Sequence, residues 1–141
     1  MLDVSPRGAI TRSSDRLDPP SAEWRREAAA GEVSVERHNA LRDAADCLNT
    51  LRVTQPQAPA QAPQQLRIAA WNLERCRHVA ESARLLKRAG ADICLLSEMD
   101  LGMARSGNRD TAADLAAALD MGHAYGVEFI ELDHGDAREA A

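Results

Sequence analysis

Two short apolar segments each lead into a side chain that could act on a phosphate. Residues 66–71 run into Asn72, and residues 92–96 are followed, after one serine, by Glu98. A carboxylate and an amide are oxygen ligands that a hard divalent cation such as Mg²⁺ accepts. The amide can also donate hydrogen bonds to phosphate oxygens. The two residues therefore predict a divalent-metal and phosphate site, provided that the fold brings them together.

The segment between these two runs has the apolar spacing of a helix. One side of it carries residues that recur every three or four positions: Val79, Ala83, Leu86 and Gly90. The whole unit is thus predicted as strand, helix, strand. A right-handed crossover makes the two strands parallel, so their carboxyl ends share one sheet edge. Because α/β proteins gather ligands at that edge, we expect Asn72 and Glu98 to meet there.

The same residues carry a family resemblance. The run that ends in Trp71-Asn72-Leu73-Glu74, followed by a helix and by Ala91-Asp92-Ile93 leading to Glu98, resembles the amino-terminal half of the endonuclease/exonuclease/phosphatase superfamily. Residues 105–109 and 125–132 also resemble stretches of bacterial members. The resemblance covers about residues 66–132. It implies an α/β fold, a partial deoxyribonuclease I-like sandwich, and a phosphoesterase that uses Mg²⁺ or Mn²⁺.

The resemblance assigns a role to each residue at the two strand ends. Glu98 is the expected metal ligand, and Asn72 is expected to contact the phosphate and to hold the neighbouring carboxylate near the metal. Glu74 is expected to assist the metal through water. The residue types alone leave other roles open: an exposed strand end or helix cap for Glu98, a local turn for Asn72, and a solvated charge for Glu74.

Two arginines flank a loop that contains glycine. Arg105 and Arg109 lie on either side of Ser106-Gly107-Asn108. Guanidinium groups bind phosphate well, so both arginines are candidate contacts to a substrate phosphate. The alternative is that they are simply solvated, as loop arginines often are.

Other parts of the resembled family's catalytic apparatus have no match in the sequence. That family also uses an Asp-x-Asn pair and a late Asp-His pair, but the chain has no Asp-x-Asn, and Asp133-His134 directly follows the last predicted strand. We therefore expect residues 66–141 to be the first part of such a domain and to be inactive by themselves. The alternative is a non-catalytic truncated or accessory fragment that needs a partner to complete its sheet and that self-associates through exposed strands. A nucleotide-binding module is disfavoured because the turn at 72–76 has no glycine.

The remaining residues predict a simple domain order. Residues 1–20 are expected to be disordered. Residues 21–53 are expected to form a helical hairpin, with Ser21 and Ser34 at the helix starts and the second helix reaching Leu51. Residues 54–65 read as a linker rich in proline and glutamine, and residues 66–141 as the phosphoesterase part. Within that part we expect a helix ending near residue 119, capped by Asn108 or Asp110, and a third strand at 124–132.

Composition limits the partners. The formal net charge is −5, of which residues 1–65 contribute −1 (8 basic, 9 acidic) and residues 66–141 contribute −4 (9 basic, 13 acidic). This acidic balance does not indicate nonspecific nucleic-acid binding, which depends on Lys and Arg neutralising phosphates. It is compatible with a small phosphate-ester substrate that binds through a metal ion. The three cysteines form no Cys-x-x-Cys pair, which disfavours a zinc site. The amino terminus lacks an apolar segment, so we expect no membrane anchor and a cytoplasmic protein.

Overall fold

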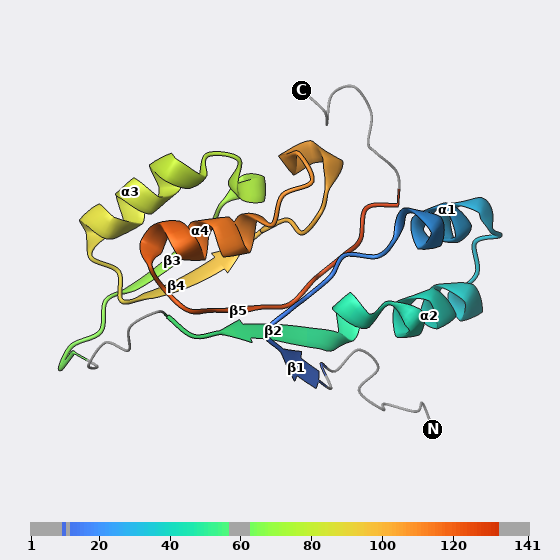
Figure 1. Ribbon diagram of the computed structural model, residues 1–141, viewed down its shortest axis with the longest axis horizontal. Coiled ribbons are helices and arrows are strands. Elements are labelled where there is room, and N and C mark those ends of the chain that lie inside the picture. Colours follow the sequence, from blue (N-terminus) through green and yellow to red (C-terminus); the bar gives the residue numbers. More distant parts are fainter. Residues whose placement is uncertain (1–9, 11, 57–62, 133–141) are drawn as a thin grey trace. The chain divides into compact units, whose positions relative to one another are not determined.

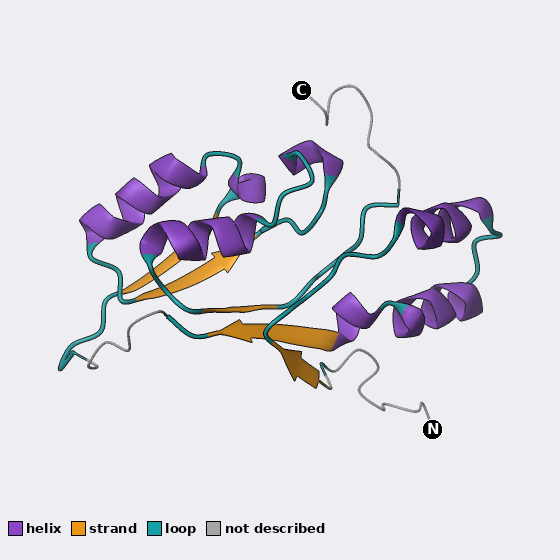
Figure 2. Ribbon diagram, viewed as in Figure 1, coloured by secondary structure: helices purple, strands orange, loops and turns teal. Residues whose placement is uncertain are grey.

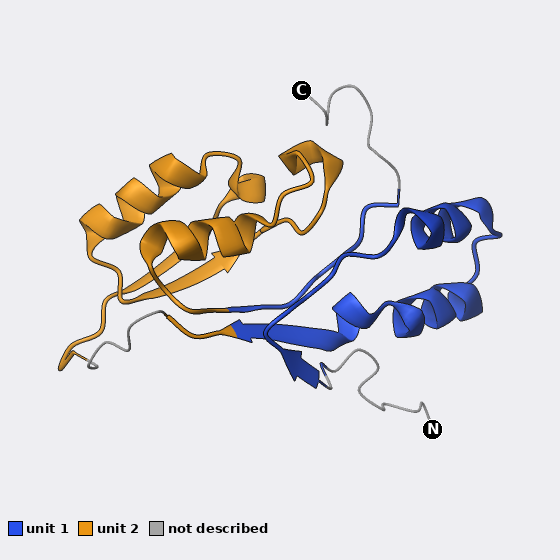
Figure 3. Ribbon diagram, in the orientation of Figure 1, with its two compact units in different colours: residues 1–53, 124–133 blue, residues 54–123, 134–141 orange. Residues whose placement is uncertain are grey.

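The computed structural model of the protein describes residues 10, 12–56 and 63–132 (Figure 1). The chain divides into two compact units (Figure 3). Unit 1 is Met1–Val53 with Ala124–Asp133, and unit 2 is Thr54–His123 with His134–Ala141. Both units contain helices and strands (Figure 2), so the chain is a mixed α/β protein.

Unit 1 contains the predicted helical hairpin. Helix α1 is Ala22–Ala30 and helix α2 is Val35–Ala44. The hydroxyls of Ser21 and Ser34 each accept a backbone N–H three residues later, at 3.1 Å, as the side chain of an N-cap does. Both predicted helix starts are therefore confirmed.

The second helix is shorter than predicted. After α2 the chain makes a 3₁₀ turn, Asp46–Asn49, and then enters strand β2, Thr50–Thr54. Thr50, Val53 and Thr54 are β-branched and favour an extended backbone, so the apolar spacing that reaches Leu51 does not continue the helix. The predicted helix through Leu51 is wrong.

Strand β2 lies at the centre of a three-stranded sheet with the order β1-β2-β5. Strand β1, Arg12–Ser14, pairs parallel to β2, so these three residues are not disordered as predicted. Residues 1–9 and 11 lie outside the described residues. Strand β5 is His123–Tyr125, and residues 126–132 are not in a strand. The predicted third strand is thus cut to its first residues, and it joins β2 rather than the strands of unit 2.

Unit 2 contains the predicted strand–helix–strand. Strand β3 is Ile68–Asn72, helix α3 is Val79–Ala89 and strand β4 is Ile93–Ser97. The strands are parallel, with Ile68 opposite Ile93 and Asn72 opposite Ser97. This part of the prediction is confirmed: the two strands are parallel and their carboxyl ends share one sheet edge.

Helix α4, Thr111–Leu119, completes unit 2 and ends where predicted. Its cap is Asp110, whose carboxylate accepts the Ala113 N–H at 3.0 Å. At the end of α3, Gly90 adopts φ +64°, a left-handed conformation that glycine reaches without a steric cost.

The core of unit 2 lies on one face of β3 and β4, where α3 and α4 cover the strands (Figure 1). Side chains alternate between faces along a strand, so Ala69, Cys94 and Leu96 face this core. The cluster that they pack against comprises Leu73, Cys76, Ala83, Leu86 and Leu115.

The other face of β3 and β4 is apolar and exposed. Ile68 and Leu95 are each 60% exposed, and Ile93 is 37% exposed. Parallel strands are usually covered on both faces, so this face is unusual for such a pair. Among the described residues, no helix is long and apolar enough to cross a bilayer. Residues 57–62 of the predicted linker lie outside the described part.

Candidate functional site

The two predicted residues meet at the carboxyl edge of the β3–β4 pair. Asn72 is the last residue of β3, and Glu98 follows β4 directly. The Asn72 Nδ2 donates a hydrogen bond to Glu98 Oε1 at 2.6 Å. Both side chains belong to exposed residues, so the pair is open to a ligand. The parallel register, which sets Asn72 opposite Ser97, makes this contact possible.

A second hydrogen bond fixes the direction of the Asn72 amide. Its Oδ1 accepts the backbone N–H of Glu74 at 3.0 Å, which forms a tight turn of the kind that asparagine favours. With Oδ1 occupied in this way, the amide nitrogen faces Glu98. Asn72 is therefore both a turn residue and a hydrogen-bond partner of the Glu98 carboxylate, and its contact with a phosphate stays a prediction.

Backbone hydrogen bonds join the two strand ends beyond the sheet. The Leu73 N–H donates to Ser97 O at 3.2 Å, and the Arg75 N–H donates to Glu98 O at 2.9 Å. The backbone of Glu98 is thus held by the turn that follows Asn72. The geometry of the pair comes from the main chain as well as from the side chains.

Left-handed backbone conformations gather around the pair. Glu98 has φ +58°, and the three residues of the turn, Glu74, Arg75 and Cys76, have φ +44°, +74° and +50°. Each such residue costs about 1 kcal/mol or more when it is not glycine. Backbone strain of this kind persists only where surrounding contacts hold it, and it is concentrated at functional sites.

The pair offers few protein ligands for a cation. Within the described residues, no three His, Cys, Asp or Glu side chains come together in a group that could hold a metal ion. Glu74 is exposed and contributes its backbone N–H to Asn72. The donor set at this edge is therefore one carboxylate oriented by one amide, and an ion bound there would keep most of its water ligands.

Arg105 lies on a short turn, Ala104–Ser106, that contacts the turn Glu74–Cys76 beside the pair. Its guanidinium is engaged by Asp100: Nε donates to Oδ2 at 3.0 Å and Nη2 donates to Oδ1 at 2.6 Å. The Arg105 side chain is 15% exposed. The alternative of a simply solvated arginine does not apply to this residue.

Arg109 is more accessible. Its Nη2 lies 2.8 Å from Asp114 Oδ2, on helix α4, and half of its side chain is exposed. Helix α4 contacts the turn Glu74–Cys76, so the ion pair of Arg109 is with the helix that lies beside the turn after Asn72.

Sequence reasoning missed the partner of Arg105. Asp100 is fully buried, and its role is not visible from its position in a polar loop. The available signal was indirect: Leu101 and Met103 are large apolar residues two positions apart at the start of that loop, and both are buried. Apolar residues of this kind indicate a packed loop, and a packed loop with a buried carboxylate needs a cationic partner.

The cysteines of unit 2 belong to the core. Cys76 is 1% exposed, and burial raises the pKa of its thiol above the ordinary value of 9.0. Burial also raises the pKa of the Cys94 thiol, which faces the same core. Both thiols therefore stay protonated at neutral pH, as structural cysteines do.

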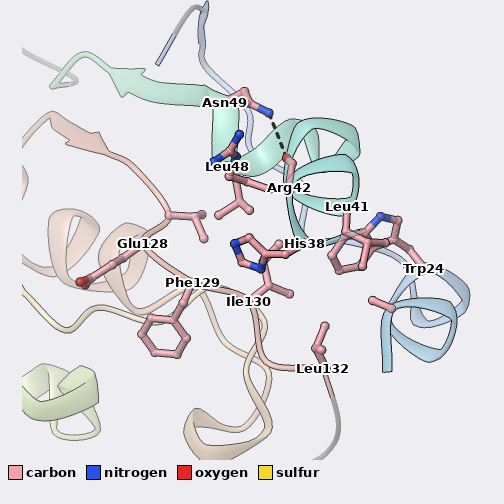
Figure 4. A pocket seen from close by; sticks show the side chains of 12 residues that line it. Trp24, His38, Leu41, Arg42, Leu48, Asn49, Glu128, Phe129, Ile130 and Leu132 are labelled. Carbon is pink, nitrogen blue, oxygen red and sulfur yellow. Dashed lines mark hydrogen bonds between the residues drawn. The ribbon is translucent and has the colours of Figure 1, made fainter. Parts of the chain in front are cut away.

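A separate pocket lies in unit 1, lined by α1, α2 and the residues that follow β5 (Figure 4). Its volume is about 370 Å³, and most of its lining is apolar. Asn49 donates a hydrogen bond to the backbone oxygen of Arg42 at its rim, at 3.3 Å. All five predicted site residues belong to unit 2, so this pocket is not part of their site. Asp133 and His134 lie outside the described residues.

Comparisons with protein-family models, with curated proteins and with solved structures found no match to this chain.

Proposed function

We propose that unit 2 forms part of a Mg²⁺-dependent phosphoesterase, of the endonuclease/exonuclease/phosphatase kind that the sequence resembles. The observation that carries the proposal is the 2.6 Å hydrogen bond between Asn72 and Glu98 at the carboxyl ends of two parallel strands. The substrate class is a phosphodiester or a phosphomonoester.

The donor set fits Mg²⁺ or Mn²⁺. Mg²⁺ binds through one or two carboxylates and keeps several waters, which matches a single exposed carboxylate such as Glu98. Glu74 would assist through a water. When bound, the ion supplies positive charge that offsets the charge on phosphate oxygens. A second carboxylate is not needed for binding of this type.

In this proposal the chain's own residues have distinct tasks. Glu98 holds the cation through its carboxylate. Asn72 keeps that carboxylate in place, and its remaining amide hydrogen can bind a phosphate oxygen. Each arginine pairs with an aspartate, but the Arg109 side chain is half exposed whereas that of Arg105 is 15% exposed, so Arg109 is the more accessible of the two to a phosphate.

Cation binding by the full 141-residue chain is the direct test. We expect Mn²⁺ to bind to the wild type, as measured by its electron paramagnetic resonance signal, and Glu98→Gln to weaken the affinity at least about tenfold. Glu81→Gln is the matched control, because Glu81 is an exposed glutamate on α3 with an ion pair to Arg84. Equal affinity in the wild type and Glu98→Gln would refute the proposed site. Phosphate-ester assays with and without Mg²⁺ then test for activity.

A second candidate function is a non-catalytic fragment that requires a partner to complete its sheet. The exposed apolar face of β3 and β4 favours it, since Ile68 and Leu95 are both 60% exposed. A stable monomer that unfolds cooperatively, measured by sedimentation and by denaturant titration, would count against this alternative. Metal binding without turnover, combined with self-association, would support it.

A further inference from the structure

The loop that follows Glu98 is closed by hydrogen bonds between Asp100 and Thr111, which form its neck. The Asp100 N–H donates to Thr111 Oγ1 at 2.8 Å, and the Thr111 N–H donates back to Asp100 O at 3.0 Å. One step further along, the Gly102 N–H donates to Arg109 O at 2.9 Å. The neck is two residues from Glu98, so it fixes the chain immediately after the candidate ligand.

The ion pair between Asp100 and Arg105 lies within this loop. The Asp100 carboxylate is fully buried and accepts two hydrogen bonds from one guanidinium, that of Arg105. Two parallel hydrogen bonds between charged groups restrict the geometry more than a single contact does. Loss of Arg105 would leave the buried Asp100 carboxylate without its cationic partner, and loss of the Asp100 charge would remove both charged hydrogen bonds, so either change disfavours the closed loop.

Glu98 therefore lies between two anchors. Before it, the Leu73 N–H donates to the Ser97 carbonyl oxygen at 3.2 Å, and at Glu98 itself the carbonyl oxygen accepts the Arg75 N–H at 2.9 Å. After it, the Asp100–Thr111 neck holds the backbone. The left-handed φ of Glu98, +58°, is a conformation that a glutamate keeps only when its surroundings impose it.

We propose that Asp100 is a positioning residue for Glu98. Its buried pair with Arg105 and its neck with Thr111 hold the strained backbone of Glu98, and so keep the Glu98 carboxylate on Asn72 Nδ2. The purpose of this arrangement, an oriented carboxylate for a cation, rests on the proposed function. The arrangement itself can be tested without a metal.

Hydrogen exchange of the Arg75 amide reports on the backbone of Glu98 directly, because that amide donates to Glu98 O. In Asp100→Asn we expect this amide to exchange about tenfold faster or more, as in a local opening. The Ser82 amide, which donates to His78 O at 2.9 Å in the first turn of α3, should keep its rate. Equal acceleration of both amides would mean global destabilisation and would overturn the proposal, as would no change at Arg75.

Two further variants protect the test against misfolding. Arg105→Lys keeps the buried charge but loses the paired hydrogen bonds, so it should accelerate the Arg75 amide less than Asp100→Asn does. Glu81→Gln is the control: it removes a carboxylate from an exposed ion pair, with Arg84, and should leave the Arg75 amide unchanged.

Mn²⁺ affinity separates this proposal from the proposed function. We expect Asp100→Asn to weaken Mn²⁺ binding about tenfold and Glu81→Gln to leave it unchanged. If Glu98→Gln has no effect on Mn²⁺ binding, the metal site is wrong, whereas the exchange result still decides whether Asp100 positions Glu98. If Glu98→Gln abolishes binding and Asp100→Asn changes neither affinity nor exchange, the positioning role alone is wrong.

Discussion

Asn72 Nδ2 and Glu98 Oε1 lie 2.6 Å apart although 26 positions separate the two residues in the chain. The contact depends on a parallel register, on a turn in which Asn72 also binds the Glu74 N–H, and on a left-handed residue at position 98. The amide is thus a neutral hydrogen-bond partner for the Glu98 carboxylate.

Replacing this neutral neighbour by a charged one should make the fold depend on a cation. In Asn72→Asp two carboxylates would share one site, and their repulsion disfavours having both ionised. We expect the melting temperature without divalent ions to fall by roughly 4–8 °C per kcal/mol of repulsion, and Mg²⁺ to recover most of the loss. Differential scanning fluorimetry with EDTA or with Mg²⁺ measures both.

Asn72→Ala is the companion variant, since it removes the hydrogen bond without adding charge. Its melting temperature should respond to Mg²⁺ no more than that of the wild type. If Mg²⁺ recovered Asn72→Ala as well as Asn72→Asp, the ion would be acting elsewhere on the protein.

The sequence predicted the strand ends well because local patterns determine them. Apolar runs that stop at Asn72 and Glu98, with a helix period between them, allow one simple arrangement, the parallel βαβ unit. The caps at Ser21, Ser34 and Asp110 were equally accessible, because an N-cap is recognised from its residue type and its place before a helix.

What the sequence did not predict depends on contacts between distant residues. Strand β2, Thr50–Thr54, is a strand because it pairs with β1 and β5, and its own spacing suggested a helix. The burial of Asp100 likewise depends on the loop closing at Thr111. The β-branched residues of β2 favour an extended backbone, but no local pattern identifies the strands that pair with β2 or the residue at which the loop closes.

Leu115→Ala should be strongly destabilising. Leu115 is 1% exposed in the core of unit 2, and truncating a buried leucine to alanine costs about 2–5 kcal/mol. Leu85→Ala is the matched control, because Leu85 on α3 is 45% exposed and the same truncation should cost little. Urea denaturation followed by circular dichroism gives both values. Similar losses of stability in the two variants would contradict the placement of Leu115 in the core and of Leu85 outside it.

The Cys76 thiol should make stability depend on pH in alkaline solution. Burial raises its pKa in the folded state, so the folded protein retains a proton that the unfolded chain loses above about pH 9. The free energy of unfolding should therefore be unaffected by this group below pH 8 and should fall as the pH rises above 9. Denaturant titrations under reducing conditions at pH 7 to 10 measure this dependence.

The variant Cys76→Ala isolates the contribution of this thiol. It removes the titrating group, so its stability should fall less between pH 8 and 10 than that of the wild type, whatever the loss at pH 7. Parallel pH curves for the two proteins would show that Cys76 titrates alike in the folded and unfolded chains.

The exposed face of β3 and β4 should govern self-association. Leu95 is 60% exposed in the middle of β4, next to Ala70 on β3, and an apolar surface of this kind gains free energy when it is covered. We expect the wild type to associate as its concentration rises and Leu95→Lys to shift the equilibrium toward the monomer, measured by sedimentation velocity. Leu85→Lys is the control, because it adds the same charge at an exposed leucine on α3. A wild type that stays monomeric, or equal shifts in both variants, would show that this face does not drive association.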